Sequence, residues 1–541
     1  SITISNGGWI RSETFSSGNA GTVQVNAGSL SIDGRNSLTG ENMLTGISSE
    51  ANPGATGSAG RVEVTVSGDL SLTNAGQISS STWSSGDAGI VLVGAGSHFI
   101  SGANPILTIV PNSLRGTGPA NIKINGKGSG IFSTRQEAAS GTEAGPITGI
   151  GSIVVAASGN IDINNGGSIS STTLSPVGKA GLVVVVAGSG ATLDSQLGLT
   201  AQNAVIGAGI GNITIDGKDP TTSTVSTTGI RSDAGAGNNG IATTGDAGDV
   251  RVMAVGKLEI NHGGLISSDT FSSGAAGSVK TTAGSVTIDG RDSGNIFTGI
   301  SSQANFTNAN QGVTGNAGNV EVAATGNLSV LNDGRISSST RSSGDAGLVS
   351  VAAGGSTTIS NGGRIRSETF SSGNAGAVQV NAGSLSIDGK NPLTGKNALT
   401  GISSDANPGA TGSAGKVEVT VSEALSLTNA GQISSSTWSP GNARSSGDAG
   451  IVLIGAESIK IDGSSGSGIF SQANGTKDNG YVTGNAGGVD LKTVGKIEIG
   501  NGGQISSSTS SSGDAGFVSV DAGGSITISN GGWIRSETFS S

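Results

Sequence analysis

The stretch Arg61–Gly89, RVEVTVSGDLSLTNAGQISSSTWSSGDAG, contains three short runs in which apolar and polar residues alternate. The runs begin at Val62, at Leu70 and at Ile78. Alternation with a period of two is typical of β-strands, and the clusters of Gly, Asn and Asp between the runs are typical of turns. The apolar spacing of three and four residues that an amphipathic helix requires is missing. The stretch therefore predicts three strands and no helix.

This three-strand pattern recurs along the chain, with a valine at the start of each first run. The shortest interval, as from Val62 to Val91, is 29 residues, and the longest intervals reach about 41. The additional residues lie in stretches rich in Gly, Asn and Pro, such as GRNSLTGEN. Ile122 and Ile213 fill two gaps in the series as weaker equivalents. The recurring valines are Val23, Val62, Val91, Val154, Val183, Val250, Val279, Val320, Val349, Val378, Val417, Val452, Val489 and Val518.

A unit of this size cannot bury its own apolar faces, whereas stacked units bury a continuous core. The 97 glycines disfavour helices, and a hydrophobic fraction of 33% is too small for several compact cores. The sequence therefore predicts an all-β fold, a three-sided parallel β-helix of about sixteen coils with three short strands per coil. Loops are inserted at fixed turns, and residues 1–541 form one elongated domain of coils of about 29 to 41 residues.

A longer repeat lies over the short one. Residues 1–83 match residues 356–438 with about a dozen differences, and Ser1–Ser17 is identical to Ser525–Ser541. Such close matching indicates recent duplication of a block of coils. We expect the chain to be a window of a longer repetitive chain or fibre. A spacer or a multivalent surface gains from such copying, whereas a catalytic site rarely survives it, so we expect no enzyme.

Charge and hydropathy disfavour two classes of partner. The net charge is −10, and Lys and Arg form no stripe of the kind that phosphate backbones require, so we expect no nucleic acid. No run of eighteen apolar residues exists, so we expect no membrane span. The chain contains no cysteine and begins without a charged and apolar leader, so we expect any export signal to lie outside this segment.

The third run places hydroxyl groups on its inward face. Ile78, Ser80 and Thr82 share one parity, so Ser80 and Thr82 point inward beside the isoleucine. Buried hydroxyls need partners, which stacked Ser/Thr ladders or backbone carbonyls can supply. In the alternative, this strand flattens at its end and water solvates the hydroxyls.

Aromatic and charged residues gather on the opposite, outward parity of the same run. In NGGWIRSETF, Trp9, Arg11, Glu13 and Phe15 alternate with Ile10. Exposed aromatic columns predict lateral contact with a fibril, an inserted loop or a carbohydrate. In the alternative, neighbouring long loops cover them. The predicted lateral-contact face consists of Trp9, Arg11, Glu13, Phe15, Trp83, Arg364, Phe370, Trp438, Trp533 and Phe539.

The remaining titratable residues predict turns rather than sites. Aspartates recur in IDG and in GDAG, where other coils have GNAG or GSAG, so a turn-forming role explains them. We expect no cofactor, and weak calcium binding at the surface stays an open alternative. His262 replaces the Asn of a sister corner, and His98 has no acidic neighbour in the sequence. No nucleophile–base pair is visible.

The stretches GNAGTVQVNAGSLSIDG, LTGISSEANPGATGSAGRVEVTVSG and LTNAGQISSSTWSSGDAG resemble the β-helical repeats of filamentous-haemagglutinin-like secreted exoproteins. This resemblance covers essentially the whole chain as a style of repeat. It implies a right-handed parallel β-helix, export through a two-partner outer-membrane route, and a role in adhesion or surface filaments. The amino-terminal secretion domain of those proteins and an RGD triplet are not visible here.

Together these features predict a structural and adhesive segment of a bacterial extracellular surface filament or sheath. Its expected partners are copies of itself, stacked head-to-tail or packed laterally, and surface carbohydrate or other cells. Two alternatives stay open, the stalk of a monomeric secreted adhesin and a β-helical polysaccharide lyase or hydrolase. The irregular regions Ser97–Pro146 and Ala191–Asn239 are where an enzyme site could lie.

Overall fold

The computed structural model describes residues 1–101, 107–111, 119–136, 151–174, 178–188, 210–235, 244–307, 314–439, 446–463, 466–475 and 484–539. The chain divides into two compact units. The first comprises Ser1–Gly284 and Asp292–Phe297, and the second comprises Ser285–Arg291 and Thr298–Ser541. The described residues of both units form strands and turns, with no helix among them. Each unit is a stack of coils and is described by itself.

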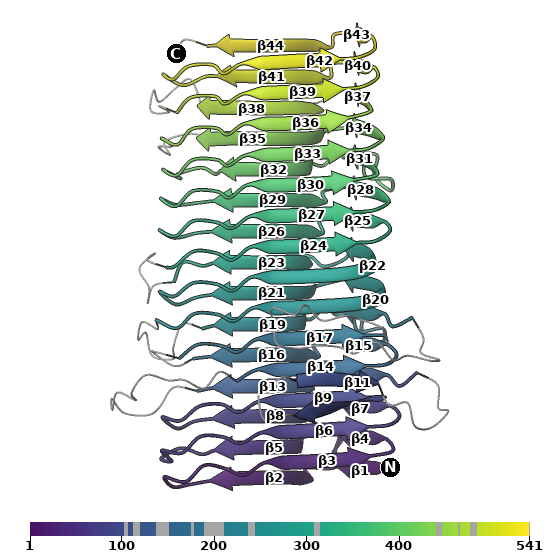
Figure 1. Ribbon diagram of the computed structural model, residues 1–541, viewed down its shortest axis with the longest axis vertical. Helices are drawn as coiled ribbons and strands as arrows, with labels where there is room; N and C mark the ends of the chain where they lie inside the picture. Colours follow the sequence, from purple (N-terminus) through teal and green to yellow (C-terminus); the bar gives the residue numbers. More distant parts are fainter. Residues whose placement is uncertain are drawn as a thin grey trace. The chain divides into compact units, whose positions relative to one another are not determined.

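In the first unit, three kinds of strand follow one another in each coil (Figure 1). The first strands are β3 (Val23–Ala27), β6 (Val62–Val66), β9 (Val91–Ala95), β14 (Ile153–Ala157) and β17 (Val183–Ala187). The second strands are β1 (Ile2–Ser5), β4 (Leu30–Asp33), β7 (Leu70–Thr73), β12 (Ile122–Asn125), β15 (Ile161–Asn164) and β18 (Ile213–Asp216). The third strands are β2 (Trp9–Thr14), β5 (Thr45–Ala51), β8 (Gly76–Thr82), β13 (Gly130–Arg135), β16 (Ser168–Thr173), β19 (Thr228–Ala234) and β21 (Gly264–Thr270).

Four further strands of this part of the chain depart from that plan. The long strand β20 (Val250–Asn261) serves as first and second strand at once, and β22 (Val279–Asp289) is only one residue shorter. An antiparallel hairpin of β10 (Ser97–Ser101) and β11 (Leu107–Pro111) is inserted between β9 and β12.

The second unit repeats the same order of strands. Its first strands are β24 (Val320–Ala324), β27 (Val349–Ala353), β30 (Val378–Ala382), β33 (Val417–Val421), β36 (Val452–Ala456), β39 (Val489–Thr493) and β42 (Val518–Ala522). The second strands are β25 (Leu328–Leu331), β28 (Ser356–Ser360), β31 (Ser384–Asp388), β34 (Ala424–Thr428), β37 (Ser458–Asp462), β40 (Ile497–Gly500) and β43 (Ile526–Ile528). The third strands are β23 (Gly299–Ala304), β26 (Arg335–Thr340), β29 (Arg364–Thr369), β32 (Thr400–Ala406), β35 (Gly431–Ser439), β38 (Gly468–Gly475), β41 (Gln504–Thr509) and β44 (Trp533–Thr538).

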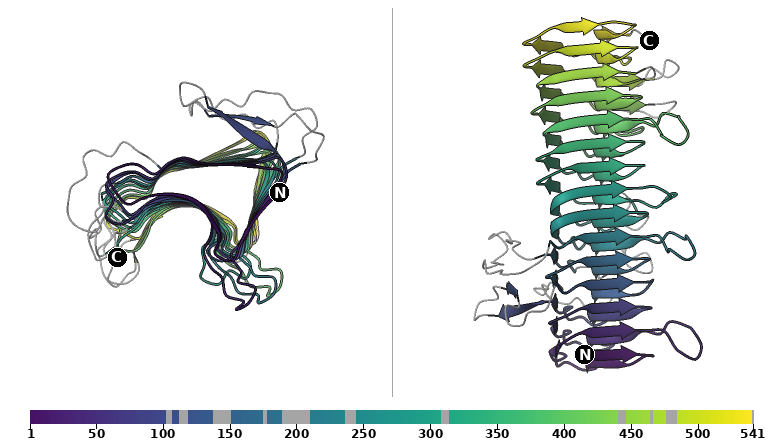
Figure 2. Two further views of the ribbon diagram at one scale, coloured as in Figure 1. Left: turned by 90° about the horizontal axis from the view of Figure 1, so that it is seen from below. Right: turned by 90° about the vertical axis from the view of Figure 1, so that its right-hand side faces the viewer.

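Outside the hairpin, strands of one kind pair in parallel and in register with the same kind in the next coil. Val23 is opposite Val62 in the first strands, Leu30 is opposite Leu70 in the second, and Ile47 is opposite Ile78 in the third. Seen along the stack, each coil encloses a narrow interior, and its third-strand side curves inward (Figure 2). This arrangement is a parallel β-helix, so the predicted all-β solenoid with three strands per coil is confirmed.

Aliphatic columns fill the interior. Val62, Val64, Leu72 and Ile78 of one coil are each 0% exposed, while the polar residues that alternate with them in the first two strands lie outside. Burying one such side chain contributes about 1.5–3 kcal/mol, and in a solenoid this gain comes almost entirely from the neighbouring coils.

The inward serine of each third strand joins two turns through its hydroxyl group. Ser80 donates to the carbonyl oxygen of Gly60 at 2.8 Å and accepts from the amide of Gly89 at 2.9 Å. Backbone carbonyls were one of the predicted partners for these hydroxyls, and the alternative in which water solvates them is wrong, since Ser80 is 0% exposed. The same pair of bonds is made by Ser49, Ser171, Ser232, Ser268, Ser338, Ser367, Ser404, Ser435 and Ser471.

The turns themselves stack so closely that they require glycine. A Cβ atom at Gly89 would lie 2.1 Å from the carbonyl oxygen of Gly60, and one at Gly86 would lie 2.4 Å from that of Gly57. Real Cβ atoms do not approach a carbonyl so closely. The first and last residues of the GDAG sequence are therefore glycines because the turns of successive coils pack against each other.

Two predictions about the coil markers are wrong. Ile122 and Ile213 lie in second strands, where they pair with Ile161, so they do not begin coils. Val154 faces outward, because its neighbour Ile153 is the residue in register with the inward Val183. Extra residues between first and second strands in these coils caused the first error.

Outward-facing apolar residues form a second, smaller cluster on the first strands of the first unit. It consists of Leu92, Val154, Ala156, Val184 and Val186, with Leu182 and Met253 at its edge. Alternation alone predicts polar residues at these outward positions. Parts of the irregular regions proposed for an enzyme site, namely residues 102–106, 112–118, 137–146, 191–209 and 236–239, lie outside the described residues.

The right-handed twist of the solenoid, the number of coils and the single elongated domain stay predictions. Among the described residues, no helix is long and apolar enough to cross a membrane.

Candidate binding surface on the third strands

The outer face of the third strands carries the predicted lateral-contact residues. In β2, Ile10 is in register with the inward Ile47, while Arg11 and Glu13 are opposite the outward Ser48 and Glu50. The predicted parity is therefore correct for this strand. Figure 2 shows that the third-strand side of each coil is concave, and the outward residues of successive coils lie on this side in each unit.

Three copies of the sequence IRSET place an ion pair on this face. Arg11 pairs with Glu13 at 2.9 Å, Arg366 with Glu368 at 2.8 Å, and Arg535 with Glu537 at 3.2 Å. Residues two apart on a strand share a face, so the pairing follows from the sequence spacing. The copy at Arg366 is the most buried, with side chains 15% and 5% exposed.

A carboxylate in the next coil stands beside two of these glutamates. Glu13 is in register with Glu50, and Glu368 is in register with Asp405. A third pair, Asp233 with Asp269, follows Arg231 in the same way. In the other described coils this outward position holds only hydroxyl or amide side chains, namely Ser81, Thr134, Thr172, Gln303, Ser339, Ser436, Gln472 and Ser508.

The pair Glu368–Asp405 lies in a pocket of about 410 Å³ within the second unit. Outward residues of β29, β32 and β35 form its floor, including Arg364, Arg366 and Gln432. Leu399 stands at one end of these strands, and Pro408 stands at the other. Phe370 and Trp438 belong to the same lining, so the structure brings together three predicted contact residues, Arg364, Phe370 and Trp438.

Buried polar atoms in this pocket lack partners. Glu368 is 4% exposed, and its Oε1 accepts from Arg366, whereas its Oε2 has no hydrogen-bond partner in the structure. The Nε atoms of Arg364 and Arg366 and one oxygen of Asp405 are buried without a partner as well. Leaving such groups unsatisfied costs about 1–3 kcal/mol each, and more when they are charged, so these atoms are positioned for a polar ligand.

Burial and like charges shift the titration of the groups around this pocket. Desolvation, and then the neighbouring Glu368 carboxylate, raise the pKa of Asp405 to about 7. Desolvation lowers the pKa of Arg364, and repulsion from Arg366 lowers it further. The pKa of Arg335, in the preceding coil, is lowered by desolvation and by these two arginines. Positive charge is therefore crowded here, and the carboxyl group of Asp405 keeps its proton up to near-neutral pH.

The duplicated block repeats this arrangement in the first unit with one major change. Trp9 occupies the position of Arg364, and Glu50 that of Asp405, while the aromatic residues Phe15 and Trp83 are retained. Burial raises the pKa of Glu50, as it does for Asp405. Asn52 contacts Glu13 at 3.4 Å in the same way that Asn407 contacts Glu368 at 3.4 Å. The two copies thus differ mainly in an arginine replaced by a tryptophan.

The aromatic side chains differ in how far they are exposed. Phe15 is 70% exposed, Trp438 is 45% exposed and Phe539 is 43% exposed. In the copy at Trp533, the guanidinium of Arg535 lies 3.7 Å from the tryptophan ring and 5.6 Å from that of Phe539. The ring of Phe370 carries the guanidinium of Arg341 at 4.6 Å. Cations therefore already occupy faces of the Phe370 and Trp533 rings.

The aspartate side chains of the GDAG turns accept hydrogen bonds from backbone amides of the next coil. Asp345 accepts from the amide of Asn374 at 2.7 Å, and Asn316 accepts from the amide of Asp345 at 2.9 Å. Asp448 likewise accepts from the amide of Asn485. Asp, Asn and Ser all supply an acceptor, which explains why they interchange here. Among the described residues, no group of three or more His, Cys, Asp or Glu is placed to hold a metal ion.

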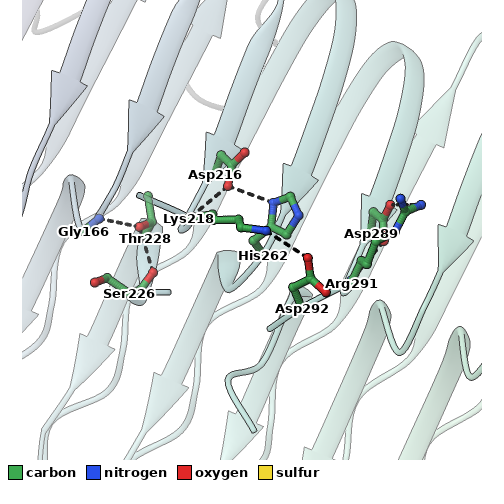
Figure 3. Close-up of polar contacts among 9 residues, drawn as sticks. All are labelled: Gly166, Asp216, Lys218, Ser226, Thr228, His262, Asp289, Arg291 and Asp292. Carbon is green, nitrogen blue, oxygen red and sulfur yellow. Dashed lines mark hydrogen bonds and ion pairs between the residues drawn. The ribbon is translucent and has the colours of Figure 1, made fainter. Parts of the chain in front are cut away.

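His262 occupies a corner position that other coils fill with asparagine. Its φ angle is 44°, compared with 51° for Asn165, and its Nδ1 lies 3.0 Å from Asp216 Oδ1 (Figure 3). Asn74 and Asp33 make the equivalent contact at 2.8 Å. His262 is therefore a corner substitution, as predicted. The side chain of His98 lies outside the described residues.

Sequence reasoning missed the carboxylate pairs. It placed Glu13, and Glu368 as its copy, on the outer face, but it did not connect Glu13 with Glu50 or Glu368 with Asp405, each of which lies 37 residues later. The available signal was the recurrence of ISSE or ISSD in the coil that follows IRSE.

Comparison with known proteins identified no relative of this chain. No family model matches the chain, and neither a curated protein nor a solved structure is significantly similar to it. The resemblance to filamentous-haemagglutinin-like exoproteins therefore stays a prediction.

Proposed function

We propose that this chain is a structural and adhesive segment of a bacterial extracellular surface filament or sheath. In this role the stacked coils supply stiffness, and the outer face of the third strands supplies contacts to other copies of the chain and to the surfaces of cells. Secretion is part of the proposal, with the export signal outside this segment. In the alternative, the chain is the stalk of a secreted adhesin, which has the same structural role but works as a monomer.

The stack has the properties that a filament segment needs. Most strands are hydrogen-bonded to both neighbouring coils, and the inward serines add bonds between turns that no solvent reaches, as Ser80 does. Neither kind of bond depends on disulfides, and the chain has no cysteine. Local opening must therefore break bonds in several coils together.

The observation that carries the adhesive part is the repetition of one group of residues on the outer face. Aromatic side chains and an Arg–Glu ion pair recur around Phe15, around Phe370 and around Phe539, and Phe15 and Phe539 are exposed. Repeated weak sites on one chain raise the overall strength of attachment, because binding at one site increases the effective concentration at the others. A soluble protein gains little from several exposed aromatic groups on one face.

Replacing Trp9, Trp438 and Trp533 with serine tests this proposal. The expected result is reduced lateral association in sedimentation velocity and in negative-stain micrographs, with an unchanged β-rich circular dichroism spectrum. A matched control replaces Phe517, which is 54% exposed before the first strand β42, with serine. Equal association of both variants and of the unmodified chain would refute the proposed contact face.

The pair Glu368–Asp405 favours a second candidate, a β-helical polysaccharide hydrolase. Glycoside hydrolysis uses two carboxyl groups that flank the bond to be broken, one of which acts as the acid, and the raised pKa of Asp405 suits the acid. Release of reducing ends from polysaccharides, abolished by Glu368→Gln and by Asp405→Asn, would support this candidate. Absence of turnover over a panel of acidic and neutral polysaccharides would leave the structural role.

A further inference from the structure

We infer that the pocket around Arg364 is a binding site for an acidic saccharide, a sugar chain that carries carboxylate groups. The inference deepens the proposed adhesive role, since it names the chemistry that one part of the contact face recognises. Four features of the pocket lead to it, namely its size, its charge, the pattern of its polar groups and its aromatic rim.

The volume suits one or two sugar rings. Pockets for small ligands range from about 300 to 1,000 Å³, and this one measures about 410 Å³. It opens on the outer face of the third strands, where Ser436, Gln472 and Ser508 continue the outward column in the following coils. A linear polymer can therefore lie along this face with one unit in the pocket.

The arginine side chains in the pocket lining favour an anionic ligand. Arg366 is paired with Glu368, whereas no described carboxylate lies within ion-pair distance of Arg364, and the buried Nε atom of Arg364 has no partner. Arg335, Arg364 and Arg366 stand in neighbouring positions of two coils and repel one another, and the charges of Asp333 and Glu368 offset part of this repulsion. A ligand carboxylate beside Arg364 would relieve this repulsion, and arginine binds carboxylates with two parallel hydrogen bonds.

The polar floor suits a ligand with many hydroxyl groups. Gln432 Nε2 already donates to Gly466 O and Asn407 Nδ2 to Glu368 Oε1, so each of these side chains offers its amide oxygen and its second amide hydrogen. Ser403 and Ser434 offer hydroxyls, and Glu368 Oε2 offers an unused acceptor. A sugar hydroxyl both donates and accepts, so it can satisfy such a mixed set. An inorganic anion such as sulfate offers acceptors only and would leave the acceptor of Glu368 unsatisfied.

The rim provides a flat apolar surface. Trp438 is 45% exposed at the edge of the pocket, and the ring of Phe370, with the guanidinium of Arg341 4.6 Å from its centroid, belongs to the same lining. The C–H face of a sugar ring packs against an indole in the way that other flat apolar groups do. We therefore assign ring stacking to Trp438 and carboxylate recognition to Arg364.

The duplicated block provides a natural variant. Trp9 replaces Arg364 in an otherwise similar arrangement, and Trp533 does so in the copy near residue 541. The fold therefore accepts tryptophan at this position of the third strand. Arg364→Trp is a test substitution that removes the charge without a risk to the backbone.

The test compares trigalacturonate with its methyl ester, which has the same rings and length but no charge. Isothermal titration calorimetry should give at least about tenfold tighter binding of the acid form to the intact chain. Arg364→Trp should abolish this preference, and Trp438→Ser should weaken binding of both sugars. Arg291→Gln, which removes an exposed arginine paired with Asp289, should change neither affinity.

Three results would overturn the inference. They are no binding of either sugar, equal binding of the two by the intact chain, and an acid preference that persists in Arg364→Trp. Lateral association of the chain, measured without sugar by sedimentation, tests the proposed function separately. If the chain associates laterally but binds neither sugar, this inference alone is refuted. If the chain binds the acid sugar but does not associate, the lateral contacts alone are refuted.

Discussion

The hydroxyl group of Ser338 donates to the carbonyl oxygen of Gly318 at 3.0 Å, and the same hydroxyl accepts from the amide of Gly347 at 2.7 Å. Gly318 lies in the turn before a first strand, and Gly347 lies in the turn of the next coil. The carbonyl and the amide are thus joined by a side chain from the third strand between them, and the bridge recurs along both units.

Ser338→Ala should destabilise these two turns. Both backbone groups would lose a buried partner, at a cost of about 1–3 kcal/mol. Hydrogen exchange at the Gly347 amide should accelerate accordingly, by about tenfold or more. The matched control is Ser339→Ala on the outer face of the same strand, which should leave that amide unchanged. Equal exchange in the two variants would show that the bridge adds nothing.

Gly347→Ala should also loosen the stack, for a steric reason. Its Cβ atom would lie 2.2 Å from the carbonyl oxygen of Gly318, whereas a Cβ atom at Gly455 would meet nothing within 4 Å. Overpacking of this kind costs about 1–3 kcal/mol, while alanine in place of an unconstrained glycine stabilises slightly. Urea unfolding should separate Gly347→Ala from Gly455→Ala by this amount. Similar midpoints would contradict the close stacking of the turns.

Stability should fall with rising pH because of Asp405. Its folded-state pKa of about 7 lies above the ordinary value of 3.8, so the folded chain holds this proton more tightly than the unfolded chain does. Between pH 4 and pH 7 the unfolded state therefore binds fewer protons, and this contribution to stability is lost as pH rises through 7.

Asp405→Asn should remove that loss. The difference in melting temperature between Asp405→Asn and the unmodified chain should grow from pH 4 to pH 7 and then level off. Asp345→Asn is the control, because asparagine keeps the acceptor that the Asn374 amide needs. A difference that stays constant over this range would mean that Asp405 titrates normally in the folded chain.

His262→Asn should be tolerated, whereas His262→Val should not. Asparagine adopts positive φ angles readily and can donate to Asp216 as Asn74 donates to Asp33, while a β-branched residue at φ 44° is strained. We expect a loss of about 1–3 kcal/mol for the valine variant in urea unfolding. Identical unfolding of the two variants would refute a corner role for this histidine.

The strands and their inward faces could be predicted because alternation in the sequence is a local property. Val62, Leu72 and Ile78 are buried as the period of two requires. Backbone carbonyls were among the predicted partners of the inward serines, but the particular carbonyl could not be predicted, because the bond from Ser80 to Gly60 depends on how the turns stack. Ile122 and Ile213 were wrongly predicted to begin coils. They lie in second strands, and the sequence does not show at which corner of a coil the additional residues are inserted.

The contact face could be predicted only in part, since pairing between coils depends on the length of the inserted loops. Arg11 and Glu13 are two residues apart, so their common face follows from the strand period. Glu368 and Asp405 are 37 residues apart, and only the register of β29 and β32 places them side by side. Their burial depends further on the walls of the pocket, which come from residues near Leu399 and Pro408.

Hydroxyl-radical footprinting of the chain before and after it associates tests the proposed contact face most directly. Trp438 and Phe15 are exposed in the isolated chain, as is Phe517 outside the third strands. We predict that association protects Trp438 and Phe15 from oxidation and leaves Phe517 reactive. Protection of Phe517, with Trp438 and Phe15 still reactive, would contradict the claim that the third strands carry the contacts.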